Sequence, residues 1–156
     1  MANSGGDRGT VVSINAGPFK GARKKPAGSG ILLEEIGLLG DAHAGFGHRQ
    51  VSLLAVESIN KMKALGLDVG PGDFAENVTT SGVELVSIPI GTRLRLGEAL
   101  LEVSQIGKVC HSRCAIFEQA GDCVMPREGI FARVLVGGNV RTGDLVEVLR
   151  KEPEHA

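Results

Sequence analysis

The residues best suited to chemistry in this sequence are its three cysteines, Cys110, Cys114 and Cys123, which all fall within one short stretch. A cysteine thiolate is both a nucleophile and a soft metal ligand, so it can attack electrophilic sulfur, carry a persulfide or bind a metal. In a reducing compartment, an odd number of cysteines argues against a disulfide framework and towards a reactive thiol, a metal site or small buried side chains. We therefore take this stretch as the candidate catalytic end of the molecule.

Cationic side chains surround the first of these cysteines. Lys108, His111 and Arg113 lie beside Cys110 in the chain. Ser112 suits the N-cap of a short helix, which would put Cys110 just before a helix N-terminus. Backbone N–H groups, the helix dipole and nearby cations all lower the pKa of a thiol. These features favour a reactive thiolate at Cys110.

Other uses of the cysteines stay open. Cys114 lies four residues after Cys110, which is one helical turn if the helix starts early enough, and it would then act as a second, resolving thiol in catalysis or as a second metal ligand. Cys123 and His111 would complete a zinc site, although only one pair of cysteines has the usual spacing. The remaining alternative is that the thiols are small buried side chains.

A glycine-rich segment over residues 37–50 supplies further candidates. It contains His43, His48 and Arg49. The histidines would be metal ligands, ligand donors or hydrogen-bonded structural groups. His48 and Arg49 are counted among the candidate cofactor contacts.

A second loop, residues 67–82, carries Glu76 and Asn77 just before a β-branched run. Asp73 and Glu76 would form an acid–base pair or, more in keeping with a loop, would hold its shape through hydrogen bonds. Asn77 is a candidate binding donor.

Composition narrows the class of partner. The 156 residues carry a formal net charge of −1 and include neither tryptophan nor tyrosine. This balance disfavours nucleic acid and acidic membranes as partners, and the basic run 20–25 is predicted to be an exposed loop. The N-terminus lacks the apolar run of a signal peptide, and no stretch approaches the roughly 18 apolar residues of a membrane span. We expect a cytoplasmic protein.

The elements that must position these groups are mainly strands. Apolar alternation and glycine turns predict strands at 10–14 and 29–35, a hairpin over 93–103 and a second hairpin over 130–149. The one long helix is predicted from Ser52, as N-cap, to Leu65, with Gly66 as its stop. These features predict a mainly β fold, a partly closed and mostly antiparallel β-barrel with one long helix and short helices. Residues 1–9 would be a disordered tail, 10–150 a single domain and 151–156 a polar tail.

Several stretches in a fixed order resemble the MOSC domain, the module shared with the C-terminal end of molybdenum cofactor sulfurases. They are residues 40–45, 48–53, 72–78, 90–99, 107–117 and 125–135. Each stretch alone is a weak signal, and the resemblance rests on the ordered set. It spans roughly Thr10 to Leu149 and matches the short bacterial members that consist of this domain.

The resemblance implies a barrel that binds the molybdenum cofactor, a molybdopterin with a dithiolene and a phosphate arm. By its position in the family pattern, Cys110 matches the cysteine proposed to carry sulfur or to ligate the metal, although many relatives have a proline where this chain has Val109. Glu76, Asn77 and Arg127 match positions that line the pocket, and the guanidinium of Arg127 suits a phosphate or a pterin carbonyl.

Three functions follow from the resemblance. The first is a sulfur-carrier module for the pterin cofactor or its precursor, with cofactor-synthesis proteins or molybdoenzymes as partners. The second is a small molybdenum-dependent reductase of N-hydroxylated substrates, and the third is a non-catalytic adaptor for cofactor-synthesis partners. Whether the protein is an enzyme, as a sulfur transferase or a reductase, stays open, and the chain has no room for a pyridoxal-phosphate domain.

Overall fold

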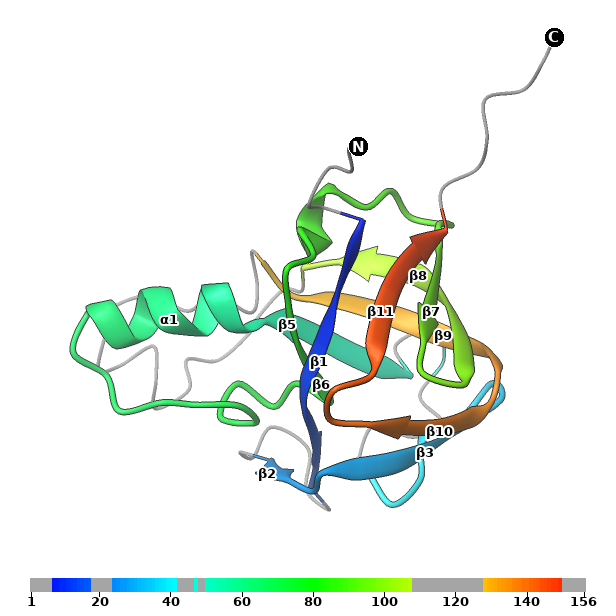
Figure 1. The fold of residues 1–156 in the computed structure, drawn as a ribbon, viewed down its shortest axis with the longest axis horizontal. Helices are drawn as coiled ribbons and strands as arrows, with labels where there is room; N and C mark the ends of the chain where they lie inside the picture. The colour runs from blue at the N-terminus through cyan, green and yellow to red at the C-terminus, as the bar shows by residue number, and fades with distance from the viewer. Residues whose placement is uncertain (1–6, 18–23, 42–46, 48–49, 108–127, 150–156) are drawn as a thin grey trace, which may run out of the picture.

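The computed structural model describes residues 7–17, 24–41, 47, 50–107 and 128–149 (Figure 1). The elements within these ranges are β1 (Arg8–Ala16), β2 (Lys25–Pro26), β3 (Ser29–Leu33), β4 (Gly37–Leu38), β5 (Val51–Ala55), α1 (Val56–Ala64), β6 (Val78–Ser81), the 3-10 helix η1 (Leu85–Ser87), β7 (Arg93–Leu96), β8 (Ala99–Ile106), β9 (Ile130–Val136), β10 (Gly138–Arg141) and β11 (Leu145–Leu149). None of the helices in these ranges is long and apolar enough to cross a membrane.

Seven strands form a closed ring. Their order is β11-β7-β8-β9-β5-β6-β1, and β1 pairs with β11 to close it, with Thr10 opposite Leu145. The β5–β6 pair is parallel and the other pairs in the ring are antiparallel. A smaller sheet, β10-β3-β4, lies beside the ring (Figure 1). The predicted mainly β, mostly antiparallel barrel is confirmed, and its ring is complete.

The strand residues alternate between the barrel interior and solvent, as the pleat requires. In β7, Leu94 and Leu96 are buried whereas Arg93 and Arg95 are exposed. β1 begins at Arg8, two residues before the expected start at Thr10, because Arg8 pairs with Glu147 of β11. Aliphatic side chains from all seven strands meet in one core.

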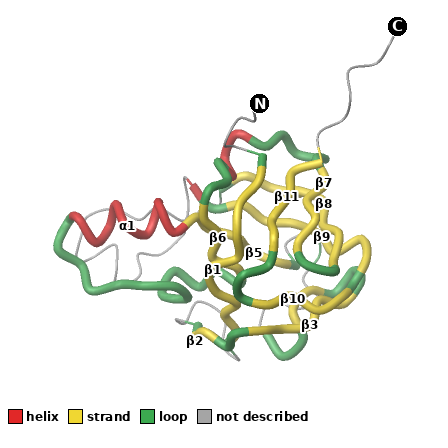
Figure 2. Tube along the Cα trace, viewed as in Figure 1, coloured by secondary structure: helices red, strands yellow, loops and turns green. Residues whose placement is uncertain are grey.

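The helix α1 extends from one side of the barrel (Figure 2). Ile59 and Met62 pack in a second apolar cluster with Leu54 of β5, Phe74 and Phe131. Because this cluster covers its outer face, the four residues 51–54 of β5 are all buried. The polar alternation of an ordinary strand is therefore missing from β5.

The predicted start of the helix at Ser52 is wrong. Residues 51–55 form a strand, and α1 begins at Val56 after Ala55, which provides no side-chain cap. Leu53 pairs with Val78 on one side and with Ile130 on the other, and these two ladders outweigh the helical pattern of the sequence. The predicted stop is confirmed, because Gly66 has a φ of 94° and donates its N–H to the carbonyl of Lys63.

The predicted hairpin over residues 130–149 is also wrong. Its three strands form as expected, but β9 pairs with β8 and β5, β10 pairs with β3, and β11 pairs with β7 and β1. Apolar alternation identifies a strand without identifying its partner, and here all partners are distant in the chain. The hairpin of β7 and β8 is confirmed.

Candidate functional site

Most of the sequence-predicted site residues lie outside the described residues, and their roles stay predictions. These residues are His48, Arg49, Lys108, Cys110, His111, Arg113, Cys114 and Arg127, together with His43 and Cys123. Glu76 and Asn77 are described. Within the described ranges, no group of three or more histidine, cysteine, aspartate or glutamate side chains is arranged to hold a metal ion.

The cysteine segment, residues 108–127, leaves and rejoins the barrel at one place. Gly107 donates its N–H to the carbonyl of Gly129 at 2.6 Å, directly beyond the paired residues Ile106 and Ile130. The neighbouring Glu128 is bound to α1, since its Oε1 accepts from Ser58 Oγ at 2.5 Å and its Oε2 from Lys61 Nζ at 3.0 Å. The barrel thus sets both ends of the segment that carries the thiols.

A buried carboxylate joins three points of the chain at another place. Oδ1 of Asp41 accepts from the N–H of Gly17 at 3.0 Å and from Nζ of Lys24 at 2.7 Å. The side chains of Lys24 and Asp41 are 0% and 1% exposed. Gly17 and Lys24 flank residues 18–23, and Asp41 precedes residues 42–46, so one oxygen atom links both described ends of the first segment to the residue before the second.

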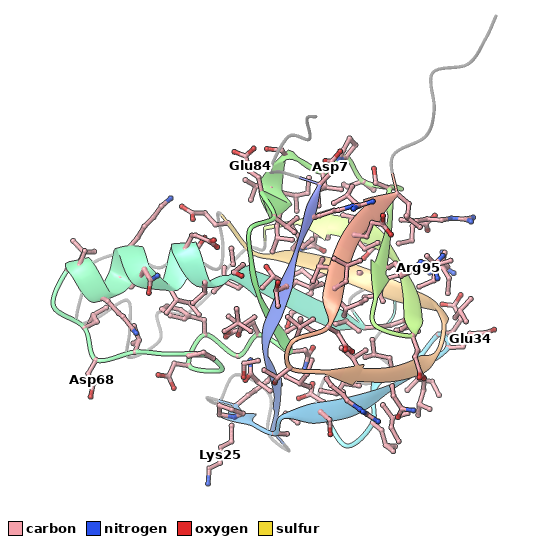
Figure 3. The ribbon with its side chains drawn as sticks, viewed as in Figure 1. Asp7, Lys25, Glu34, Asp68, Glu84 and Arg95 are labelled. Carbon is pink, nitrogen blue, oxygen red and sulfur yellow. The ribbon has the colours of Figure 1, made fainter. Side chains whose placement is uncertain are left out.

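The burial of Lys24 corrects the prediction that the basic run 20–25 is an exposed loop. Its neighbour Lys25 points away from the barrel (Figure 3), as a solvated lysine should. Lys24 differs because a carboxylate compensates its charge away from water. Charge runs in a sequence do not show which member has such a partner.

Gln50 holds the chain next to residues 48–49. Its Oε1 accepts from the N–H of Val134 at 2.9 Å, and its Nε2 donates to the carbonyl of Gly47 at 2.8 Å and to Glu35 Oε1 at 3.2 Å. The hydrogen bond from Arg133 lowers the pKa of Glu35 most, and the hydrogen bond from Gln50 lowers it further. This side chain links β9, Gly47 and Glu35 without offering a free polar atom.

Glu76 is fully buried, and both of its carboxyl oxygens are in use. Oε2 accepts from the N–H of Gly72 at 2.9 Å and from Thr79 Oγ1 at 2.7 Å, and Oε1 accepts from the N–H of Phe74 at 3.2 Å. Burial raises the pKa of Glu76, and the hydrogen bonds offset part of this effect. The prediction that Glu76 holds the loop by hydrogen bonds is confirmed.

Asn77 joins three strands of the barrel. Its side-chain Oδ1 accepts from the N–H of Ser52 at 2.9 Å and from the hydroxyl of Ser52 at 3.2 Å. Its Nδ2 donates to the carbonyl of Asn15 at 3.4 Å, and its own N–H donates to Ser52. We call the following set of buried polar residues in the described part of the chain the frame: Asn15, Lys24, Asp41, Ser52, Glu76 and Asn77. A direct contact of Glu76 or Asn77 with a cofactor stays a prediction.

Four residues of this frame were not identified as site residues from the sequence: Asn15, Lys24, Asp41 and Ser52. Asn15 donates from Nδ2 to Thr79 Oγ1 at 3.0 Å and to the carbonyl of Glu76 at 3.2 Å. The only signal for Asp41 in the sequence was its place in the Gly-Asp-Ala-His stretch. The roles of Asn15, Lys24 and Ser52 follow from contacts with residues far away in the chain, which the sequence alone does not show.

Two adjacent threonines of β6 give a matched prediction for this frame. Thr79→Val removes the hydroxyl between Asn15 and the Glu76 carboxyl, so we expect the free energy of unfolding to fall by about 1–3 kcal/mol. Thr80→Val, on the opposite face, replaces a buried hydroxyl without a hydrogen-bond partner, so we expect no loss and a gain of up to about 1 kcal/mol. Urea unfolding of both variants measures the difference, and equal losses would contradict the assigned network.

The fold and the frame define a class, the closed β-barrel with one helix on its side. The family model of the MOSC domain matches residues 39–147, more than half of the chain. The chain belongs to the MOSC domain family. No curated protein matches it.

Several solved structures share the fold of this chain. The crystal structure of the YuaD protein from Bacillus subtilis matches with a TM-score of 0.76 at 21% identity, covering 90% of this chain and 95% of that one. YiiM from Geobacillus stearothermophilus has a TM-score of 0.67 at 21% identity and covers 91% of this chain and 75% of its own. YiiM from Escherichia coli has a TM-score of 0.65 at 22% identity, and the match covers 94% of this chain and 72% of that one. At these identities the likeness concerns the fold.

Proposed function

We propose that this protein is a molybdenum cofactor-binding module that handles sulfur, with Cys110 carrying sulfur or ligating the metal. The observation that carries the proposal is the match of residues 39–147 to the MOSC domain, a family related to the domains of molybdenum cofactor sulfurases. The matched range contains all three cysteines and the frame built on Asp41, Glu76 and Asn77. Cofactor-synthesis proteins or molybdoenzymes would be the partners.

The donor set in the sequence fits such a cofactor. A thiolate at Cys110 is a soft ligand suited to the metal, and the cationic side chains of Lys108, Arg113 and Arg127 suit a phosphate arm. In the frame, the side-chain oxygens of Glu76 and Asn77 already accept hydrogen bonds within the protein. We therefore expect these two side chains to hold the fold around the site. When bound, the cofactor would supply a metal centre that accepts sulfur ligands and exchanges electrons.

The chain's own part in sulfur transfer would be that of a nucleophile. The Cys110 thiolate attacks the outer sulfur of a persulfide donor, the donor's S–S bond breaks, and the donor leaves as a thiolate. One S–S bond forms as another breaks, so the exchange requires no added oxidant or reductant. Cations near Cys110 would keep the thiol ionised and ready for this step.

The test uses protein made in cells that synthesise the cofactor and purified without reductant. We expect the intact mass to show one additional sulfur that added thiol removes, or elemental analysis to show molybdenum. Cys110→Ser should lower retained sulfur and molybdenum by more than about tenfold, since even the loss of a group that supports a ligand has effects of this size. Cys123→Ser, the matched control from the same segment, should retain both.

The outcomes separate the candidate functions. Molybdenum without a removable sulfur, together with turnover of an N-hydroxylated substrate by an artificial electron donor, would favour the reductase. Bound zinc in place of molybdenum, or unchanged loading in Cys110→Ser, would overturn the proposal. A partner complex that survives replacement of all three cysteines would favour the adaptor.

A further inference from the structure

A cleft of about 510 Å³ lies between helix α1 and residues 82–86, which follow β6 and enter η1. Its apolar lining consists of Ala55, Val83, Leu85 and Val86. Val83 and Leu85 are buried, whereas Val86 is 39% exposed. Protein sites for ligands have volumes of this order and mainly apolar linings with a few polar groups. All residues that line the cleft are described, and none of them belongs to the frame.

Hydrogen bonds hold the walls of the cleft in place. Gly82 donates its N–H to Oε2 of Glu57 at 3.0 Å, which joins the end of β6 to the first turn of α1. On the next turns of the helix, Ser58 and Lys61 donate to the carboxylate of Glu128, which precedes β9. Three separate parts of the chain are therefore fixed around one space. A cleft built in this way binds without first having to order its walls.

The charged side chains of the lining have a negative balance. Lys61 is paired with Glu128, from Nζ to Oε2 at 3.0 Å, so these two charges compensate each other. Glu57 accepts from a neutral N–H group, which leaves its negative charge in place. Glu84 contributes a further exposed carboxylate to the lining. The cleft thus combines an apolar surface with carboxylates, and this combination complements a ligand that is both aliphatic and cationic.

We propose that this cleft docks a short segment of a partner protein in which an aliphatic side chain lies next to a lysine or an arginine. The aliphatic side chain covers Val86 and the apolar lining, and the cation pairs with Glu57 and Glu84. This docking goes beyond the proposed function, because the lining contains neither a cysteine nor a frame residue. Through Glu128, however, it places the partner beside the described end of the cysteine segment.

The exposure of the lining favours a protein segment over a free amine. A small molecule binds where the protein encloses most of its surface. Here Glu57, Glu84 and Val86 are exposed or half-exposed, so the cleft encloses only part of a ligand. A side chain of a larger partner needs less enclosure, because the rest of the interface contributes to its binding. Central aliphatic contacts surrounded by charged pairs are the usual composition of such interfaces.

NMR titration of the full ¹⁵N-labelled chain with a short probe peptide tests the docking. The probe is Ala-Lys-Leu-Ile-Lys-Ala with both termini blocked, so that only the lysines are charged. We expect shifts of the amide signals of Ser58, Gly82 and Val86, with a Kd below about 1 mM. A peptide with glutamates in place of the lysines should bind at least about tenfold more weakly. The affinity for the lysine peptide should also fall as salt is added, because salt screens exposed charges.

Surface variants of the protein locate the contact. Glu84→Lys should weaken binding of the probe by about threefold to tenfold, because it replaces an attraction with a repulsion. The matched control is Glu34→Lys, an exposed glutamate on another side of the barrel (Figure 3), which should leave the affinity unchanged. Val86→Ser should weaken binding by about threefold through the lost apolar contact, whereas Val136→Ser, at 51% exposure elsewhere on the barrel, should have no effect.

Several results would overturn the proposal. One is the absence of shifts at the cleft, as expected if another part of the chain already fills it. Tighter binding of the glutamate peptide, or equal losses in Glu84→Lys and Glu34→Lys, would show that the carboxylates of the cleft do not select the ligand. If butylammonium binds as tightly as the peptide, the cleft is a site for small cations and not for a protein segment.

Discussion

Replacing Asp41 by alanine is expected to lower the free energy of unfolding by about 3–5 kcal/mol, the usual result of removing one partner from a buried ion pair. The ammonium group of Lys24 would be left in a buried site without its counter-ion, at 0% side-chain exposure. The N–H of Gly17 would also lose its acceptor, so two donors would remain unsatisfied. Urea unfolding at neutral pH measures the loss.

The matched control is an ion pair on the surface. Arg8 is paired with Glu147 at 3.2 Å, but its side chain is 73% exposed, so Arg8→Ala should reduce stability by less than about 1 kcal/mol. Lys24→Met combined with Asp41→Leu should recover part of the loss, because no charge then remains buried. A loss for Asp41→Ala as small as that for Arg8→Ala would show that water reaches the pair.

Replacing Gly72 by alanine is expected to reduce stability by about 2–5 kcal/mol, because two costs add at one residue. The backbone of Gly72 has a φ of +89°, where any residue with a Cβ is strained. A Cβ would also lie 2.3 Å from the carbonyl oxygen of Lys24, which is backbone and held in place by its surroundings. The substitution would push residues 70–76 away from Lys24.

Gly143→Ala separates the two costs. Gly143 has a similar φ of +97°, but a Cβ there would meet nothing within 4 Å, so only the backbone cost of about 1–2 kcal/mol applies. The difference between the two variants in thermal or urea unfolding measures the close approach to Lys24. If both variants lose the same amount, the approach of Gly72 to Lys24 is looser than the structure shows.

The same two sites show where reasoning from sequence ended. Glycine at position 72 indicated a turn, but its need for glycine depends on Lys24, 48 positions earlier in the chain. Likewise, Lys24 belongs to the basic run 20–25, which was predicted from the sequence to be exposed. The burial of Lys24 depends on its ion pair with Asp41. In each case the deciding partner lies outside the local pattern.

Strands illustrate the same division. The alternation Arg93 to Leu96 correctly predicted both a strand and its buried face, because a period of two is a property of the strand itself. For β5, helical spacing and a serine in N-cap position suggested a helix from Ser52. The structure makes Ser52 a strand residue whose N–H donates to Asn77, since pairing on both sides outweighs local preference.

The sequence by itself determined the family, the mainly β barrel, the burial pattern of the β7–β8 hairpin and the helix stop at Gly66, because each depends on local periodicity or on the order of short motifs. The predicted roles of Cys110, Cys114 and Arg127 also come from that order and await experiment. Only the tertiary structure decided the partners of β9, β10 and β11, the burial of Lys24 with Asp41, and the enclosure of Glu76. These features depend on contacts between residues far apart in the chain, whose stabilisation arises when closure of the barrel removes the surrounding groups from water.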